Sequence, residues 1–153
     1  MIDEDLKFMK LALDLAKKAE SKNEVPVGAV IVKDGEVIGR GMNRSISDHD
    51  PTSHAEINAI REAAKAIGNY RLKDCLIYVT LEPCAMCVGA IQHARISKIF
   101  YGASDPKTGA CGSVVNLIRI EEINHHTEVY GGLLERECGQ VLKDFFLAKR
   151  KKP

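Results

Sequence analysis

Two short motifs hold four side chains whose chemistry suits a metal ion and a proton transfer. His54-Ala55-Glu56 forms the first, and Pro83-Cys84-Ala85-Met86-Cys87 forms the second. Structural zinc sites are closed by four Cys or His ligands, whereas catalytic sites keep one position for water and place a proton carrier beside it. One imidazole, two thiolates and a carboxylate that is not needed as a ligand therefore indicate catalysis.

Each motif also has a simpler interpretation. A C-x-x-C pair occurs in redox dithiols and in structural zinc knuckles. Pro83 predicts a helix start, whose free N–H groups and positive dipole end stabilise thiolates in both kinds of site. Ser53 and Glu56 have the spacing of a capping box, in which Ser53 caps a helix and Glu56 reaches back to the first N–H. All four residues together favour the catalytic zinc interpretation.

The pattern H-x-E…P-C-x-x-C resembles the signature of zinc-dependent nucleobase deaminases. This resemblance implies that His54, Cys84 and Cys87 hold one Zn²⁺ ion, which makes a bound water available as the nucleophile. It also implies that Glu56 takes a proton from this water, passes it to the ring nitrogen and later protonates the departing ammonia.

Further segments extend the resemblance over nearly the whole chain, to the bacterial tRNA-specific adenosine deaminases. The zinc motif is shared with cytidine, cytosine and guanine deaminases, so the flanking segments carry the assignment to this family. They are Glu24-Val25-Pro26-Val27-Gly28-Ala29-Val30, Gly41-Met42-Asn43-Arg44, Asp50-Pro51-Thr52-Ser53, Tyr78-Val79-Thr80-Leu81-Glu82 and Asp105-Pro106-Lys107-Thr108-Gly109-Ala110.

What the resemblance implies is specific. The fold would be a three-layer α/β/α, cytidine-deaminase-like fold with a central mixed, mostly parallel sheet. The reaction would be the hydrolytic conversion of adenosine to inosine at the wobble position of a tRNA anticodon, with tRNA-Arg as the expected substrate. The enzyme would work as a cytoplasmic homodimer that binds the anticodon stem-loop.

The same resemblance gives roles to five residues around the reacting base. Asn43 would hydrogen-bond the flipped base, Val27 would form an apolar wall, and Ala55 would offer a backbone N–H near the reacting centre. Asp105 and Lys107 would lie at the nucleic-acid entrance. Without the resemblance, Asn43 is a turn residue, Val27 a buried strand residue, and the last two belong to a solvated loop.

Composition predicts a single domain over residues 1–153. With 45% hydrophobic residues the chain can bury most of its apolar surface in one core. Five cysteines are an odd number, and no apolar leader or membrane segment is evident, so we expect reduced thiols in the cytoplasm and no membrane association. Cys75 and Cys138 are expected in the core, and Cys111 is not expected to be a ligand.

The formal net charge is +1, but the chain closes on a basic run, Lys149-Arg150-Lys151-Lys152-Pro153. Such a run indicates an anionic partner or a solvated tail, and composition does not separate the two.

Hydrophobic periodicity predicts alternating helices and strands without a linker or a repeat. Helix and strand order then favours helices on both faces of the sheet, with the zinc ligands in a crevice beyond the strand ends. Helices are expected over 3–19, after His54 with Ile57, Ile60, Ala64 and Ile67 on the core, over 85–93 and over 133–149. Strands are expected over 25–32 and 37–42 as a hairpin around Asp34-Gly35, and over 76–80, 96–101 and 127–130.

Two other functions remain compatible with these residues. A free nucleobase deaminase acting on guanine or cytosine would use the same zinc and glutamate, and would need no basic rim. A zinc-stabilised RNA-binding module without turnover would explain the ligands but not the free carboxylate of Glu56.

Overall fold

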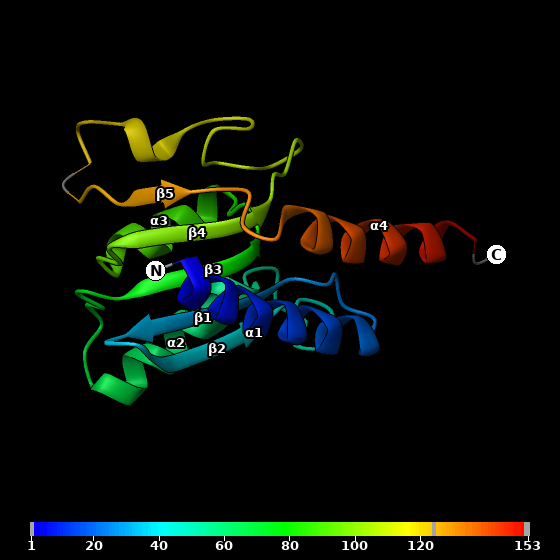
Figure 1. Cartoon of the computed structure of the whole chain (residues 1–153), viewed down its shortest axis with the longest axis horizontal. Helices are drawn as coiled ribbons and strands as arrows, with labels where there is room; N and C mark the ends of the chain where they lie inside the picture. The colour runs from blue at the N-terminus through cyan, green and yellow to red at the C-terminus, as the bar shows by residue number, and fades with distance from the viewer. Residues whose placement is uncertain (1, 124, 152–153) are drawn as a thin grey trace.

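A computed structural model of the chain describes residues 2–123 and 125–151. Its sheet has the strand order β2-β1-β3-β4-β5 (Figure 1). β1 (Gly28–Lys33) pairs antiparallel with both β2 (Glu36–Met42) and β3 (Leu76–Leu81), while β3 pairs parallel with β4 (Lys98–Ala103) and β4 with β5 (Glu128–Tyr130). Only β1 runs against the other four strands, so the sheet is mixed and mostly parallel in direction, as predicted.

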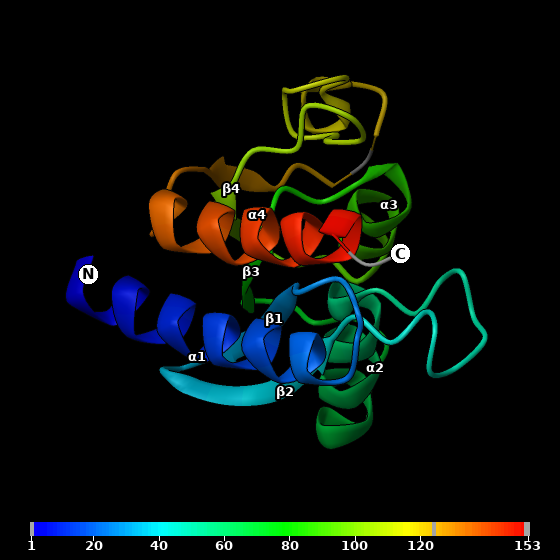
Figure 2. The ribbon, with the colours of Figure 1, turned by 90° about the vertical axis from the view of Figure 1, so that its right-hand side faces the viewer.

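Helices cover both faces of the sheet, which gives the three predicted layers. α1 (Ile2–Ser21) and α4 (Glu135–Lys151) lie on one face, and α2 (Ala55–Ile67) and α3 (Ala85–His93) lie on the other (Figure 2). Strands between two helical layers bury alternate residues on opposite sides. In β1, Val30 and Val32 pack towards α1, whereas Ala29 and Ile31 pack towards α2.

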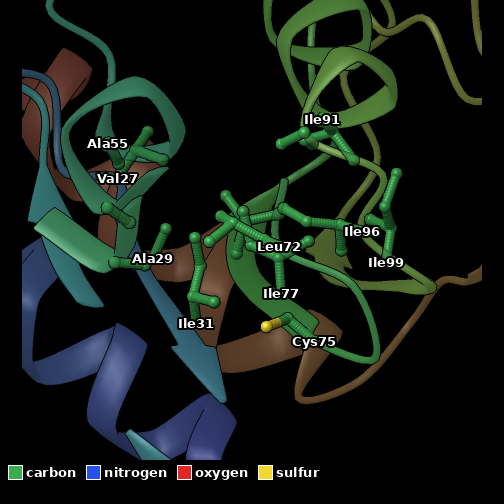
Figure 3. Close-up of a cluster of buried hydrophobic side chains, with 14 residues drawn as sticks. Val27, Ala29, Ile31, Ala55, Leu72, Cys75, Ile77, Ile91, Ile96 and Ile99 are labelled. Atoms are coloured by element: carbon green, nitrogen blue, oxygen red, sulfur yellow. The ribbon is translucent and has the colours of Figure 1, made fainter. Parts of the chain in front are cut away.

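The core on the α2 and α3 side is the larger of the two and is shown in Figure 3. Cys75 is fully buried in it, and Cys138 is buried in the core on the other face. Both cysteines are therefore core residues, as the sequence predicted.

Most element boundaries fall within a few residues of the predicted ones. The hairpin turn at Asp34-Gly35 and the helix over 85–93 are as expected. β1 begins at Gly28 rather than at residue 25, β4 and α4 are shifted towards the C-terminus by two residues, and the short 3₁₀ helix η1 (Leu117–Arg119) was not predicted. Pro83 lies before the cap of α3 rather than in its first turn.

α2 packs most deeply through alanines, and the predicted core residues lie at the edge of the same contact. Ala55, Ala59 and Ala63 are fully buried, whereas Ile60, Ala64 and Ile67 are partly buried against the same core, as predicted. Alanines suit the deepest positions because β2 approaches closely, and a Cβ at Gly41 would overlap the backbone of α2 at Ala55. This contact fixes the start of α2 against the end of β2.

Across the described residues, no helix is both long enough and apolar enough to cross a bilayer.

Candidate active site

Two helix N-termini bring the three predicted metal ligands together at one edge of the sheet. β2 and β3 run in the same direction, so their carboxyl ends meet there, and α2 and α3 begin just beyond. His54 immediately precedes α2, Cys84 immediately precedes α3, and Cys87 lies in the first turn of α3. The Nδ1 atom of His54 is 3.7 Å from the Sγ atom of Cys84 and 3.5 Å from that of Cys87. Among the described residues, this is the group of His, Cys, Asp and Glu side chains that could hold a metal ion.

Protons are shared unevenly among these ligands. The pKa of Cys84 is lowered to about 4, first because Cys87 donates a hydrogen bond to its thiolate and then because His54 does so. The same hydrogen bond raises the pKa of Cys87, and the contact with Cys84 raises the pKa of His54. A metal ion that binds here must displace the Cys87 proton, because the thiolate is the binding form.

Glu56 is a buried carboxyl group beside the ligands. Only 4% of the residue is exposed, and its pKa is raised to about 7, mainly because burial disfavours the charged form. The nearby Cys84 thiolate also raises this pKa, while the His54 charge lowers it. A carboxyl group that titrates near neutrality can accept and release a proton, which suits general acid–base catalysis.

The start of α2 is capped by a residue from another element, and the alternative interpretation of Ser53 and Glu56 as a capping box is wrong. The Ser53 hydroxyl donates to Asp48 Oδ2 at 2.7 Å, and the residue preceding α2 makes no side-chain cap. Instead, the Ala55 N–H donates to Asn43 Oδ1 at 2.8 Å. Asn43 follows β2, so the end of this strand is tied to the helix that carries Glu56. This hydrogen bond orients the Asn43 amide and uses one lone pair of its oxygen, while the nitrogen remains a donor that can meet a ligand.

A cavity of about 270 Å³ opens beside the ligands. It is somewhat smaller than the roughly 300–1,000 Å³ of pockets that enclose drug-sized ligands, so it suits one planar base. Its lining includes three of the predicted substrate residues, Val27, Asn43 and Asp105, but not Ala55 or Lys107. Other lining residues were not predicted to contact substrate, namely Glu24, Val25, Ser45, Ile46, Leu81, Glu82 and Thr108.

Comparison with known proteins places this site in a family. Residues 3–150 match the MafB19-like deaminase family. The chain is 53% identical over 147 residues to a tRNA-specific adenosine deaminase of Haemophilus influenzae, and the match covers 95% of this chain and 85% of the relative. This chain belongs to the MafB19-like deaminase family.

Solved structures of similar proteins agree with this assignment. One comes from a study of A-to-I editing by tRNA:A34 deaminases at the wobble position of transfer RNA. It has a TM-score of 0.86 and 48% identity over 89% of this chain and 99% of that one. A guanine deaminase of Bacillus subtilis has a TM-score of 0.62 and 47% identity, but the match covers only 64% of this chain and 63% of the other.

Membership of a deaminase family decides between several of the open interpretations. A deaminase is an enzyme, so a redox dithiol and an RNA-binding module without turnover are both excluded. The choice between RNA and a free base depends on the surface around the cavity rather than on the ligands, because both kinds of deaminase share the ligand motif.

The loop after β4 forms one side of the cavity and carries Asp105 and Lys107. The Asp105 carboxylate accepts hydrogen bonds from the Lys107 N–H at 3.0 Å and from the Thr108 hydroxyl at 2.7 Å. Asp105 therefore shapes the turn that presents Lys107. In the same loop Cys111 lies outside the ligand group, and burial raises its pKa to about 12, which makes it a poor thiolate donor.

Proposed function

We propose that this chain is a zinc-dependent tRNA adenosine deaminase, which hydrolyses adenosine to inosine and ammonia at the wobble position of an anticodon. The observation that carries the proposal is the group of His54, Cys84 and Cys87 beside the separate, buried Glu56, within a cavity sized for one base. The similarity to tRNA-specific adenosine deaminases over 95% of the chain supports the same substrate.

The ligand group fits zinc. Tetrahedral zinc with bonds of about 2.1 Å to nitrogen and about 2.3 Å to sulfur separates these two ligand atoms by about 3.6 Å. The nitrogen–sulfur distances of 3.7 and 3.5 Å at His54 lie on either side of this value. One imidazole and two thiolates are also a donor set that zinc prefers, and three ligands leave a position for water.

Zinc, when bound, lowers the pKa of a coordinated water towards neutrality and opposes the upward shift of the nearby Glu56 pKa. Glu56 then takes a proton from the attacking water and delivers it to the ring nitrogen beside the attacked carbon. The same carboxyl group protonates the leaving amine, so that ammonia departs. Burial of Glu56 keeps bulk water away from these transfers.

Asn43 and Val27 would receive the flipped adenine. Val27 is 3% exposed and lines the cavity as an apolar wall. Because Asn43 Oδ1 accepts from Ala55, its Nδ2 is the donor available to an acceptor nitrogen of the purine. In this arrangement Ala55 contributes to substrate binding through the Asn43 amide that it orients.

A second cavity would offer a basic surface to the anticodon loop. It is lined by Lys107, Phe146, Lys149 and Arg150. The Phe146 side chain is exposed beside three cationic residues, which is the combination that stacks an unpaired base and holds its phosphates. Lys107, which we assign to the entrance, and Lys149 and Arg150 of the basic run line the same cavity, while Lys152 lies outside the described residues.

A second copy of the chain would cover the surface around α3 and η1. Exposed apolar residues lie in α3 and on both sides of η1, namely Met86, Val114, Val115 and Ile120. An exposed apolar surface of this kind is commonly buried in an interface, which supports a homodimer. Measuring the molar mass in solution for the wild type and for Val115→Glu tests this, since a monomeric wild type would contradict it.

Five free cysteines support a reducing compartment, and we place the enzyme in the cytoplasm with its tRNA substrate. tRNA-Arg remains the proposed tRNA, to be compared with other tRNAs that carry adenosine at the wobble position.

The rival function is deamination of free guanine, which the similarity to a guanine deaminase favours. Incubation with an anticodon stem-loop, adenosine, cytidine, cytosine and guanine, scored by ammonia and inosine, separates the two. We expect the stem-loop to be the fastest substrate by at least about tenfold in kcat/KM. Faster turnover of guanine or cytosine would replace the proposal by the rival.

A further inference from the structure

Two buried glutamates hold the loops on either side of the substrate cavity. Glu24 is 1% exposed and Glu82 is 2% exposed, and both line the cavity. Glu24 accepts hydrogen bonds from the loop after β2, namely from the Ile46 N–H at 3.1 Å and from the N–H and hydroxyl of Ser47, each at 2.6 Å.

Glu82 makes the corresponding contacts with the loop after β4. It accepts from the N–H groups of Asp105 at 3.0 Å, Cys111 at 2.9 Å and Ser113 at 3.1 Å, and also from the Ser113 hydroxyl. The loop backbone at Gly109 packs directly against this carboxyl group, because a Cβ at Gly109 would overlap it.

Buried carboxylates are costly unless several donors satisfy them, so these contacts are strong constraints on the loops. The constraint matters because both loops carry substrate residues. Ser45 and Ile46 line the cavity from the first loop, and Asp105 and Thr108 line it from the second. Neither 43–54 nor 104–113 contains a helix or an extended strand, so little regular structure fixes their positions.

We propose that Glu24 and Glu82 are positioning residues, which fix the two loops at the spacing that an RNA anticodon loop requires. This inference rests on the proposed function. The two carboxylates act through the loops, because each donor they bind belongs to a loop residue. Binding of the RNA strand depends on both loops, whereas the chemistry at Glu56 depends on α2 and α3. Loss of either glutamate should therefore raise KM for the stem-loop more than it lowers kcat.

The variants Glu24→Gln and Glu82→Gln test the proposal. Glutamine has the same shape but replaces one acceptor oxygen by an N–H₂ group, which faces the loop N–H donors. We expect KM for an anticodon stem-loop to rise at least about tenfold, with kcat within about threefold of the wild type and zinc content unchanged. Glu62→Gln is the matched control, because Glu62 accepts a backbone N–H from Arg40 at an exposed position.

Amide hydrogen exchange gives a readout that does not need activity. Glu24→Gln should speed exchange at Ile46 and Ser47 only, and Glu82→Gln should speed it at Asp105, Cys111 and Ser113 only. Gly109→Ala is a second variant in case Glu82→Gln does not fold. The added methyl group would overlap the Glu82 carboxyl group, so it should displace the same loop and give the same rise in KM.

Two results would overturn the inference. Unchanged exchange in both variants would show that the glutamates do not hold the loops. A KM within about twofold of the wild type, measured while exchange shows a loosened loop, would show that loop position does not govern RNA binding. Failure of the wild type to deaminate the stem-loop is a different outcome, since it refutes the proposed function whatever the exchange pattern shows.

Discussion

Asn43 has a different function at each end of its amide, and two substitutions separate them. Its oxygen caps the Ala55 N–H at the start of α2, and its nitrogen is the donor that we assign to the purine. Asn43→Ala removes both functions. Asn43→Asp keeps an acceptor for the Ala55 N–H and replaces the donor by a second carboxylate oxygen.

The size of each effect follows from the burial of the contact. Ala55 is fully buried, so Asn43→Ala leaves its N–H without an acceptor and removes the cap of α2. The two losses together lower the free energy of unfolding by about 1–2 kcal/mol. In a domain of 153 residues this lowers Tm by roughly 2–8 °C. Asn43→Asp should change stability by less than about 1 kcal/mol, because a helix N-terminus tolerates a negative charge. Both variants should lose about 10- to 100-fold in kcat/KM, as expected when one hydrogen bond to the base is removed.

The assay combines thermal unfolding of the zinc-loaded protein with kcat/KM on an anticodon stem-loop. Asn69→Ala is the control, since Asn69 accepts the Arg71 N–H at an exposed position and should leave both quantities unchanged. Wild-type kcat/KM in Asn43→Asp would refute the assignment of the amide nitrogen to the base. An unchanged Tm in Asn43→Ala would refute the capping argument.

Three further predictions concern the metal, the basic surface and acid stability. His54→Ala should lose zinc, whereas Glu56→Gln should retain about one zinc per chain while its activity falls by at least about 10²-fold. Zinc loss from Glu56→Gln, measured by elemental analysis, would show that the carboxylate is a ligand. Truncation after Ala148 should reduce the log–log salt dependence of stem-loop binding by about 0.7 for each phosphate that the shortened protein no longer binds, and an unchanged slope would make the run a solvated tail. Burial raises the pKa of Glu24, but hydrogen bonds from Ser47 and Ile46 outweigh it and hold the pKa below its ordinary 4.5. The contribution of Glu24 to folding stability is therefore complete above pH 4.5 and is lost as the pH falls through the lowered pKa. The difference in unfolding free energy between the wild type and Glu24→Gln should therefore shrink in acid, and a constant difference would contradict this.

Elements with a local signal were predictable from the sequence. Asp34-Gly35 between apolar runs indicated the hairpin, and the short apolar stretch after Cys84 indicated α3 with its observed bounds. The group that could hold a metal ion, together with Glu56, could be proposed for a similar reason, because residue type and spacing within two short motifs indicate the chemistry.

The hydrogen bonds that shape the cavity have no such signal. Asn43 meets Ala55 across 12 positions, Glu24 meets Ser47 across 23, and Glu82 meets the Ser113 hydroxyl across 31. Hydrogen bonds between loops depend on where the sheet places the strand ends, and periodicity along the chain does not encode that. From the sequence, Glu24 was therefore given no role of its own and was included only in a segment that resembles the family. In the structure it is among the most buried polar residues.

The start of α2 shows why the capping-box interpretation, which competed with the catalytic one, does not hold. Ser53 and Glu56 have the spacing of a reciprocal cap, and a glutamate used in this way would be turned back towards the helix start. The structure instead engages Ser53 with Asp48 and caps the helix with Asn43 from the end of β2. Glu56 is thereby released from a structural role and is buried beside the ligands, where its pKa rises to about 7. The local rule fails at the residue to which we assign proton transfer, which is where sequence rules and functional demands are expected to conflict.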